Sequence, residues 1–182
     1  MQSNKLRTLT LMLGAVGIVA LSGCLSNPVA STPKPAAVAE IAPTQGNTVK
    51  GTVEFAPQGD KVLVTATLSG LAPNSTHGFH IHEKGDCSAP DGTSAGGHFN
   101  PDKVQHGQGE IRHVGDMPNI KADAKGNATY SEALDLLSLD AASPNYIVER
   151  GVIVHQNPDD YVSQPVGNAG ARLACGVITA VK

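Results

Sequence analysis

Alternating apolar and polar positions are the main structural signal in this chain. Residues 49–55 and 62–68 place apolar side chains at every second position, which is the period of a strand with one buried face. The segment between them, Pro57-Gln58-Gly59-Asp60, has the residue types of a hairpin turn. Further candidate strands are residues 77–83, 128–133, 147–155 and 175–181. Residues 132–140 are the longest helical alternative, and we interpret them as a turn or loop.

Two long segments rich in Gly, Pro, Asn and Asp interrupt these strands, at about residues 85–115 and 156–171. Structureless loops of this length are uncommon in a compact domain and usually carry function. The chain has no Trp and few other aromatic residues, so its core must consist mainly of Val, Ile, Leu and Ala. The pattern predicts an all-β sandwich or barrel with long functional loops.

The N-terminal residues have the features of a secretory signal. Lys5 and Arg7 precede an apolar run over residues 8–21, and Leu21-Ser22-Gly23-Cys24 is similar to a bacterial lipoprotein processing site. Residues 1–23 are therefore predicted to be removed and Cys24 to be lipidated, although an ordinary signal cut or an uncleaved anchor is an alternative. Residues 24–46, rich in Pro, Ala, Ser and Thr, are predicted to be the lipidated Cys and a flexible tether, and residues 47–182 the folded domain.

This prediction places the protein in the bacterial cell envelope, facing the periplasm and attached to a membrane by its lipid. Leu25 is not acidic, which slightly favours the outer membrane. Removing residues 1–23 takes away two basic residues, so 13 − 2 = 11 Lys and Arg remain against 16 Asp and Glu. This acidic balance, without a basic tract, argues against nucleic acid as a partner.

Two cysteines remain if Cys24 carries lipid. Cys87 and Cys175 allow a single pairing, and disulfides persist in exported proteins. We expect this bridge, which would close a loop of 175 − 87 = 88 residues. Two buried thiols are the alternative.

Six of the seven histidines, together with one aspartate, form candidate metal ligands. Imidazole and carboxylate groups in this combination suit zinc and copper. The strand period places His80 and His82 on one face, and a second strand can add His155, which gives a strand-based set. A loop-based set consists of His106, His113 and Asp116. His98 lies between the sets in sequence, and its two ring nitrogens permit, but do not require, a bridge between two metals.

Five motifs together are similar to the copper–zinc superoxide dismutase family, over about residues 47–181. They are His77-Gly78-Phe79-His80-Ile81-His82-Glu83, Gly96-Gly97-His98-Phe99-Asn100-Pro101, His113-Val114-Gly115-Asp116, Val154-His155 and Gly167-Asn168-Ala169-Gly170-Ala171-Arg172-Leu173-Ala174-Cys175-Gly176. The resemblance implies a Greek-key β-sandwich or flattened barrel of about eight antiparallel strands. It also implies an enzyme that disproportionates superoxide to oxygen and hydrogen peroxide by copper redox cycling.

The same resemblance implies a role for each candidate residue. Copper would be held by His80, His82, His98 and His155, and zinc by His98, His106, His113 and Asp116, so that His98 is the bridge and takes part in catalysis. Arg172 would guide the superoxide anion to copper, and Cys175 would be bridged to Cys87. Asp159, with Asp160 as a rival, would join His80 to His106, and His77 would be structural.

Two departures from the family limit what carries over. The segment between His155 and Arg172 is shorter than in eukaryotic members and contains no Lys, so the steering lysines of that loop are missing. The dimer contact differs between bacterial and eukaryotic members, which leaves a homodimer open. A non-catalytic periplasmic copper- or zinc-binding module is the alternative function, and Arg172 argues against it because a metal store needs no cation beside its metal.

Overall fold

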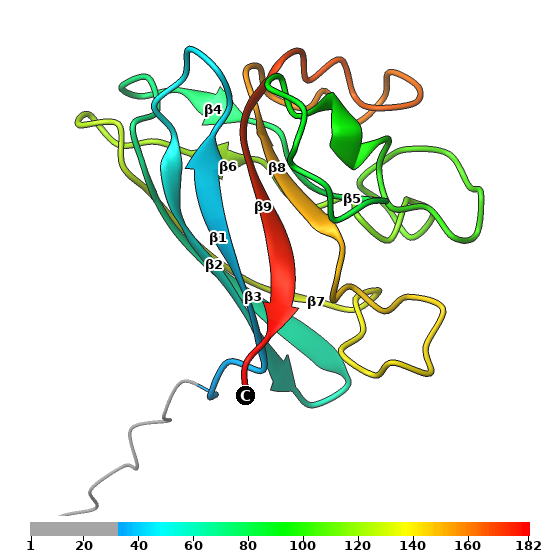
Figure 1. Cartoon of the computed structure of the whole chain (residues 1–182). Coiled ribbons are helices and arrows are strands. Elements are labelled where there is room, and N and C mark those ends of the chain that lie inside the picture. The colour runs from blue at the N-terminus through cyan, green and yellow to red at the C-terminus, as the bar shows by residue number, and fades with distance from the viewer. Residues whose placement is uncertain (1–32) are drawn as a thin grey trace, which may run out of the picture. The chain divides into compact units, whose positions relative to one another are not determined.

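Residues 33–182 are described by a computed structural model, in which regular structure is almost entirely β (Figure 1). The strands are β1 (Ala37–Pro43), β2 (Lys50–Gln58), β3 (Lys61–Ser69), β4 (Thr76–His77), β5 (Phe79–His82), β6 (Ile120–Lys121), β7 (Ala128–Leu134), β8 (Gly151–His155) and β9 (Arg172–Ala180), with one short 3-10 helix, η1 (Thr93–Ala95). The predicted all-β class is confirmed. No helix within this part of the chain is long and apolar enough to cross a membrane.

Seven of the strands form one antiparallel sheet that curls on itself (Figure 1). Its strand order is β5-β8-β9-β1-β2-β3-β7, and β4 pairs with β6 in a separate two-stranded sheet. The predicted hairpin joins β2 to β3, and Gln58 pairs with Lys61 across a turn of Gly59 and Asp60. Gly59 has a φ of +63°, which glycine adopts at little cost.

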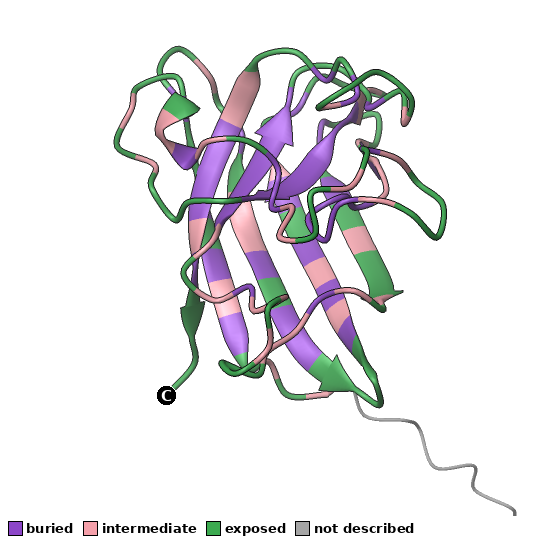
Figure 2. Cartoon of the chain, turned by 90° about the vertical axis from the view of Figure 1, so that its right-hand side faces the viewer, coloured by how far each residue is buried: buried purple, intermediate pink, exposed green. Residues whose placement is uncertain are grey.

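The core lies inside the curl and consists of alternate residues from each strand. Val53 and Phe55 of β2 are fully buried, as are Val64 and Leu68 of β3. Figure 2 shows this as alternating buried and exposed bands along the long strands. Strands β5 and β8 differ, because every residue in them is buried. The loops around them therefore cover their second face, which is where the histidines project.

Strand β1 corrects the prediction of a tether that reaches residue 46. Ala37, Ala39 and Ile41 are buried, and β1 pairs with β2 on one side and β9 on the other. The folded domain therefore includes β1 and begins at or before residue 37. The prediction failed because small apolar residues resemble a linker in composition, whereas here they fit between two strands. The lipidation prediction for Cys24 falls on residues 1–32, which lie outside the described residues.

Three other strand boundaries differ from those predicted from the sequence. Residues 147–150 precede the strand, since Glu149 has a φ of +67° and β8 begins only at Gly151. Strand β9 starts at Arg172, three residues before the predicted start. The predicted strand at 77–83 is divided at Gly78 into β4 and β5.

Candidate metal centre

Two neighbouring strands carry the strand-based histidines. His80 pairs with Ile153 across β5 and β8, while Phe79 and Ile81 are fully buried in the core. His155 ends β8 at a register shift. The prediction that His80 and His82 share the face opposite Phe79 and Ile81 agrees with this arrangement.

The loop between β5 and β6 brings the remaining candidates against the same strands. Isolated antiparallel β-bridges of the backbone pair His82 with His98 and His80 with Asp116. The side chains form two clusters with His98 in both: His80, His82, His98 and His155 in one, and His98, His106, His113 and Asp116 in the other. Within each cluster the possible ligand atoms lie within 4.8 Å of one another, and all of these residues are buried.

His82 and His155 present unprotonated nitrogens to each other. Each donates a hydrogen bond from Nδ1 to a backbone oxygen, His82 to Gly96 at 2.9 Å and His155 to Gly170 at 3.3 Å. A neutral imidazole carries one proton, so both Nε2 atoms have lone pairs, and these atoms are 3.2 Å apart. Two buried lone pairs at this distance repel each other unless a cation lies between them. The donor set therefore fits a metal ion.

His98 presents one nitrogen to each cluster. Its Nδ1 lies 2.8 Å from Oδ1 of Asp116, whereas its Nε2 is buried with no hydrogen-bond partner among the described residues. The ring lies 4.0 Å from that of His80, centroid to centroid. The Nδ1 of His80 is likewise buried without a partner. This arrangement would allow His98 to serve as a ligand to two ions.

Asp116 is the centre of the loop-based cluster. Its carboxylate lies 2.9 Å from Nδ1 of His106 and 3.2 Å from Nδ1 of His113, yet both nitrogens lack a hydrogen bond of acceptable geometry. Ligands at about 2.0 Å from a tetrahedral zinc ion are roughly 3.3 Å apart, so these spacings fit zinc ligands. The backbone N–H groups of Gly107 and His113 donate to Oδ2, the carboxylate oxygen that faces His106.

Asp159 connects the two clusters from behind. Its Oδ2 accepts a hydrogen bond from Nε2 of His80 at 2.8 Å, and its Oδ1 accepts one from Nε2 of His106 at 2.9 Å. The rival Asp160 is exposed and accepts hydrogen bonds from Val162 and Ser163 instead. Protonation at Nε2 leaves Nδ1 of both histidines free for a metal.

Burial keeps His82, His98 and His155 neutral. It lowers the pKa of His98 to about 4 and that of His155 to about 3, and in both cases the nearby His80 adds to the effect. Burial, with His98 and His155 nearby, also lowers the pKa of His82. His106 differs: burial alone would lower its pKa, but the carboxylates of Asp116 and Asp159 outweigh burial and raise it to about 9.

The two carboxylates are held in their charged form. Burial alone would raise the pKa of Asp116, but contacts with His106, His113 and His98 outweigh it and lower the pKa strongly. The pKa of Asp159 is lowered in the same way, against burial, by hydrogen bonds from His106 and His80. Both groups can therefore neutralise part of the charge of bound divalent ions.

Arg172 lies beside the strand-based cluster at the start of β9. Its guanidinium donates hydrogen bonds to the carbonyl oxygens of Gly92 at 2.8 Å and Gly96 at 2.6 Å. The oxygen of Gly96 also accepts from Nδ1 of His82. One backbone atom therefore links Arg172 to a candidate copper ligand. Arg172 is half-buried, and burial lowers its pKa.

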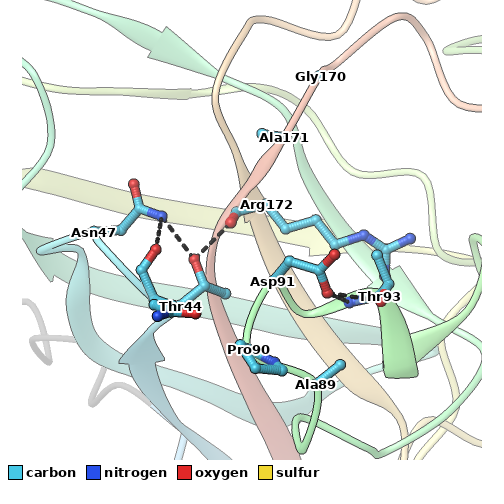
Figure 3. A pocket seen from close by; sticks show the side chains of 10 residues that line it. Thr44, Asn47, Ala89, Pro90, Asp91, Thr93, Gly170, Ala171 and Arg172 are labelled. Carbon is cyan, nitrogen blue, oxygen red and sulfur yellow. Dashed lines mark hydrogen bonds between the residues drawn. The ribbon is translucent and has the colours of Figure 1, made fainter.

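Arg172 lines a pocket of about 780 Å³ (Figure 3). The pocket is bounded by Thr44 and Asn47 on one side and by Asp91 and Thr93 on the other. None of the clustered histidines lines it. It therefore lies outside the metal clusters, with Arg172 on its wall.

The predicted disulfide is confirmed. Cys87 and Cys175 are bridged, with their Cα atoms 5.8 Å apart, and the bond ties the long β5–β6 loop to β9. His77 lies outside both clusters. Its Nδ1 donates to the backbone oxygen of His155, and its Nε2 contacts the Ser75 hydroxyl, as expected of a structural histidine.

Sequence reasoning missed the groups that hold the site through the backbone. Gly96 offers a carbonyl to both His82 and Arg172, and Thr44, in the segment predicted to be a tether, contacts the backbone of Arg172. Asn119 holds the backbone of Asp159 from both sides. The paired glycines before His98 are the one sequence signal that could have indicated such a tight approach.

The fold and its clusters define a β-protein with two adjacent histidine-rich sites that could hold metal ions and that share His98. The copper/zinc superoxide dismutase (SODC) family model matches residues 49–178. The chain is 42% identical over 145 residues to Superoxide dismutase [Cu-Zn] 2 of Aquifex aeolicus, covering 77% of this chain and 84% of that protein. It is 43% identical over 141 residues to the Extracellular superoxide dismutase [Cu-Zn] of Caenorhabditis elegans, covering 72% of this chain and 62% of that protein.

A solved structure agrees with these relatives. The crystal structure of a double mutant of a SOD-like protein from Bacillus subtilis superposes with a TM-score of 0.73 at 35% identity, covering 79% of this chain and 97% of that chain. The chain belongs to the copper/zinc superoxide dismutase family. The prediction of an enzyme of this family, an oxidoreductase with copper and zinc as cofactors, is confirmed.

Proposed function

We propose that this protein disproportionates superoxide, with copper held by His80, His82, His98 and His155, and zinc by His98, His106, His113 and Asp116. The observation that carries the proposal is His98, which directs Nδ1 to one cluster and an unpartnered, buried Nε2 to the other. When bound, copper supplies the redox couple that converts superoxide to oxygen and hydrogen peroxide, and zinc supplies charge without redox chemistry.

The protein's own residues orient the metal ligands and handle the proton. Asp159 fixes the rings of His80 and His106 by accepting their Nε2 protons. Because the contact with Asp116 fixes the Nδ1 side of His98, its Nε2 is the atom at which a proton can be held and then released. The bridge therefore gives His98 a catalytic role that an isolated copper ligand would not have.

Arg172 attracts and orients the anionic substrate. The predicted mature chain carries 11 basic against 16 acidic residues, so the field at Arg172 must oppose the overall charge. Residues 156–171 contain no Lys or Arg, which leaves Arg172 as the cation nearest to the strand-based cluster in that part of the sequence. A cation at this place raises the local concentration of superoxide and turns it toward the cluster.

The alternative, a non-catalytic metal-binding module, is not favoured. Such a module has no use for a cation whose guanidinium shares a carbonyl with a metal ligand. It would also need no histidine shared by both clusters. The membership of the family and the complete ligand sets support the enzyme.

The bridge is tested by recording the electron paramagnetic resonance spectrum of bound copper before and after zinc is removed. In the wild type the spectrum should change, because loss of zinc frees one side of His98. In His98→Ala the copper spectrum should be insensitive to zinc, and dismutation should fall to background. Equal zinc sensitivity in the two proteins would contradict the bridge.

The proposal includes export and attachment to a membrane by lipid on Cys24. It rests on the sequence Leu21-Ser22-Gly23-Cys24 and on a relative that is named extracellular. The protein would then face the periplasm, with the outer membrane favoured by Leu25. Cys24→Ser should stay unprocessed or become soluble on fractionation. An unmodified mature N-terminus beyond residue 24, found by mass spectrometry, would contradict lipidation.

A further inference from the structure

The turn between β1 and β2 lies against the backbone of Arg172 (Figure 3). The Thr44 hydroxyl lies 2.7 Å from the backbone oxygen of Arg172 and 3.0 Å from that of Leu173, and it accepts a hydrogen bond from Nδ2 of Asn47. The backbone N–H of Thr44 also donates to the oxygen of Leu173. Thr44 therefore fixes the first peptide groups of β9 through both its hydroxyl and its backbone N–H.

Thr44 is an exception among the polar side chains of residues 33–182. It is 8% exposed, and every other buried polar or charged side chain there is His77 or belongs to the clustered ligands and Asp159. A buried hydroxyl costs stability unless it is hydrogen-bonded. Its place directly beneath Arg172, rather than in the apolar core, points to a task at that arginine.

The same turn also holds the loop that receives the guanidinium. The backbone N–H of Gln45 donates to the oxygen of Pro90 at 2.7 Å, two residues before Gly92, which accepts from Arg172. Gly92 has a φ of +74°, and a Cβ there would lie 3.3 Å from Cγ2 of Thr44 and 3.4 Å from Cβ of Arg172. The turn thus contacts the backbone of Arg172 directly, and it holds the loop whose Gly92 carbonyl binds the guanidinium.

We propose that Thr44 is a positioning residue for Arg172, and the proposal rests on the role assigned above to Arg172 in guiding superoxide. The hydroxyl of Thr44 fixes the backbone from which the arginine side chain projects. The β1–β2 turn fixes the position of the Gly92 carbonyl, which accepts a hydrogen bond from the guanidinium. Because the side chain is long, a small tilt at its backbone displaces the guanidinium from the Gly96 oxygen and so from the copper cluster.

The test uses Thr44→Val, which keeps the shape and removes the hydroxyl, with Thr44→Ser to restore it. Thr48→Val is the matched control, because the Thr48 hydroxyl is in the same turn and donates to the oxygen of Gly70, away from Arg172. Full-length proteins are loaded with copper and zinc, and metal content is measured. Then kcat/KM for superoxide is measured against ionic strength, and modification of Arg172 by phenylglyoxal is followed by mass spectrometry.

Thr44→Val should keep both metals, lose about three- to tenfold in kcat/KM at low ionic strength and show a shallower salt dependence. Its Arg172 should be modified severalfold faster, since the guanidinium is less well held. Thr44→Ser and Thr48→Val should behave as wild type. If Thr44→Val does not fold, Asn47→Ala replaces it in the test. That variant removes the donor to the Thr44 hydroxyl and should show the same changes in kcat/KM, salt dependence and Arg172 modification, but smaller ones.

Two failures can be told apart. A metal-loaded wild type without dismutation would overturn the proposed function. An active wild type together with wild-type kcat/KM, salt dependence and Arg172 modification in Thr44→Val, or in Asn47→Ala where that variant decides, would overturn the positioning role alone. Faster modification in Thr48→Val as well would also overturn it, because the effect would then belong to the turn and not to Thr44.

Discussion

Replacement of Asp159 by Asn tests how the two metal clusters depend on one another. The Asp159 carboxylate accepts Nε2 protons from both His80 and His106, whereas an amide offers one accepting oxygen and one donating nitrogen. The histidine that faces the amide nitrogen must move its proton from Nε2 to Nδ1. Since Nδ1 is the nitrogen that faces the cluster, that histidine can no longer bind a metal without paying for the change of tautomer.

The expected loss is about 10–100-fold in metal affinity, or about 1.4–2.7 kcal/mol. We expect copper to be affected more than zinc. The backbone N–H of Tyr161 also donates to Oδ1 of Asp159, so the amide oxygen should stay toward His106 and the amide nitrogen should face His80. The side chain of Gln164 also holds the backbone N–H and the oxygen of His106, which keeps this histidine in place. Competition with a coloured zinc chelator, and separately with a copper chelator, measures the two affinities.

Asp160→Asn is the control, because it removes the same charge one residue along the chain. Asp160 is exposed and contacts no histidine among its hydrogen-bond partners, so both affinities should stay at the wild-type value. Wild-type affinity for both metals in Asp159→Asn would refute the reasoning. An equal loss in Asp160→Asn would show that the effect is one of overall charge.

Three further predictions concern substrate guidance, the disulfide and pH. Arg172→Ala should keep both metals and lose about 10–100-fold in kcat/KM; a steady-state assay showing wild-type rates at low salt would contradict it. Cys87→Ser should lose roughly 2–5 kcal/mol of unfolding free energy, because the bridge closes an 88-residue loop; an unchanged guanidinium midpoint would count against this. In the metal-free protein, the pKa values of about 4 for His98 and about 3 for His155 lie below the ordinary 6.5. Below pH 6.5 the unfolded chain therefore binds more protons than the folded chain, so the stability present above pH 6.5 is lost as pH falls toward 4. A denaturation midpoint that stays flat over this range would contradict this prediction.

The strand-based candidates could be predicted because strand period and ligand chemistry coincide in them. His80 and His82 are two residues apart on a strand and therefore share a face, which needs no knowledge of the fold. The spacing of His98 permitted a bridge without requiring one, and only the family resemblance gave the bridge its place. The structure adds the reason, since the two nitrogens of His98 face different clusters.

Strand β1 and the support of Arg172 could not be predicted in this way. Ala37 and Ala39 are small residues that are also common in linkers, and their burial depends on β2 and β9, which are distant in sequence. Gly96 acts through its carbonyl oxygen, a group that every residue has. Contacts of this kind are set by the path of the backbone, so the identity of the residue carries little information about them.

Metal content measured together with dismutation on the purified protein is the most direct test of the proposed function. The chain should be prepared with β1 intact, because that strand lies between β2 and β9 in the sheet. We predict one copper and one zinc per chain, rapid loss of superoxide, and loss of that activity when copper alone is withdrawn. A protein that holds both metals and leaves the decay of superoxide at its spontaneous rate would contradict it.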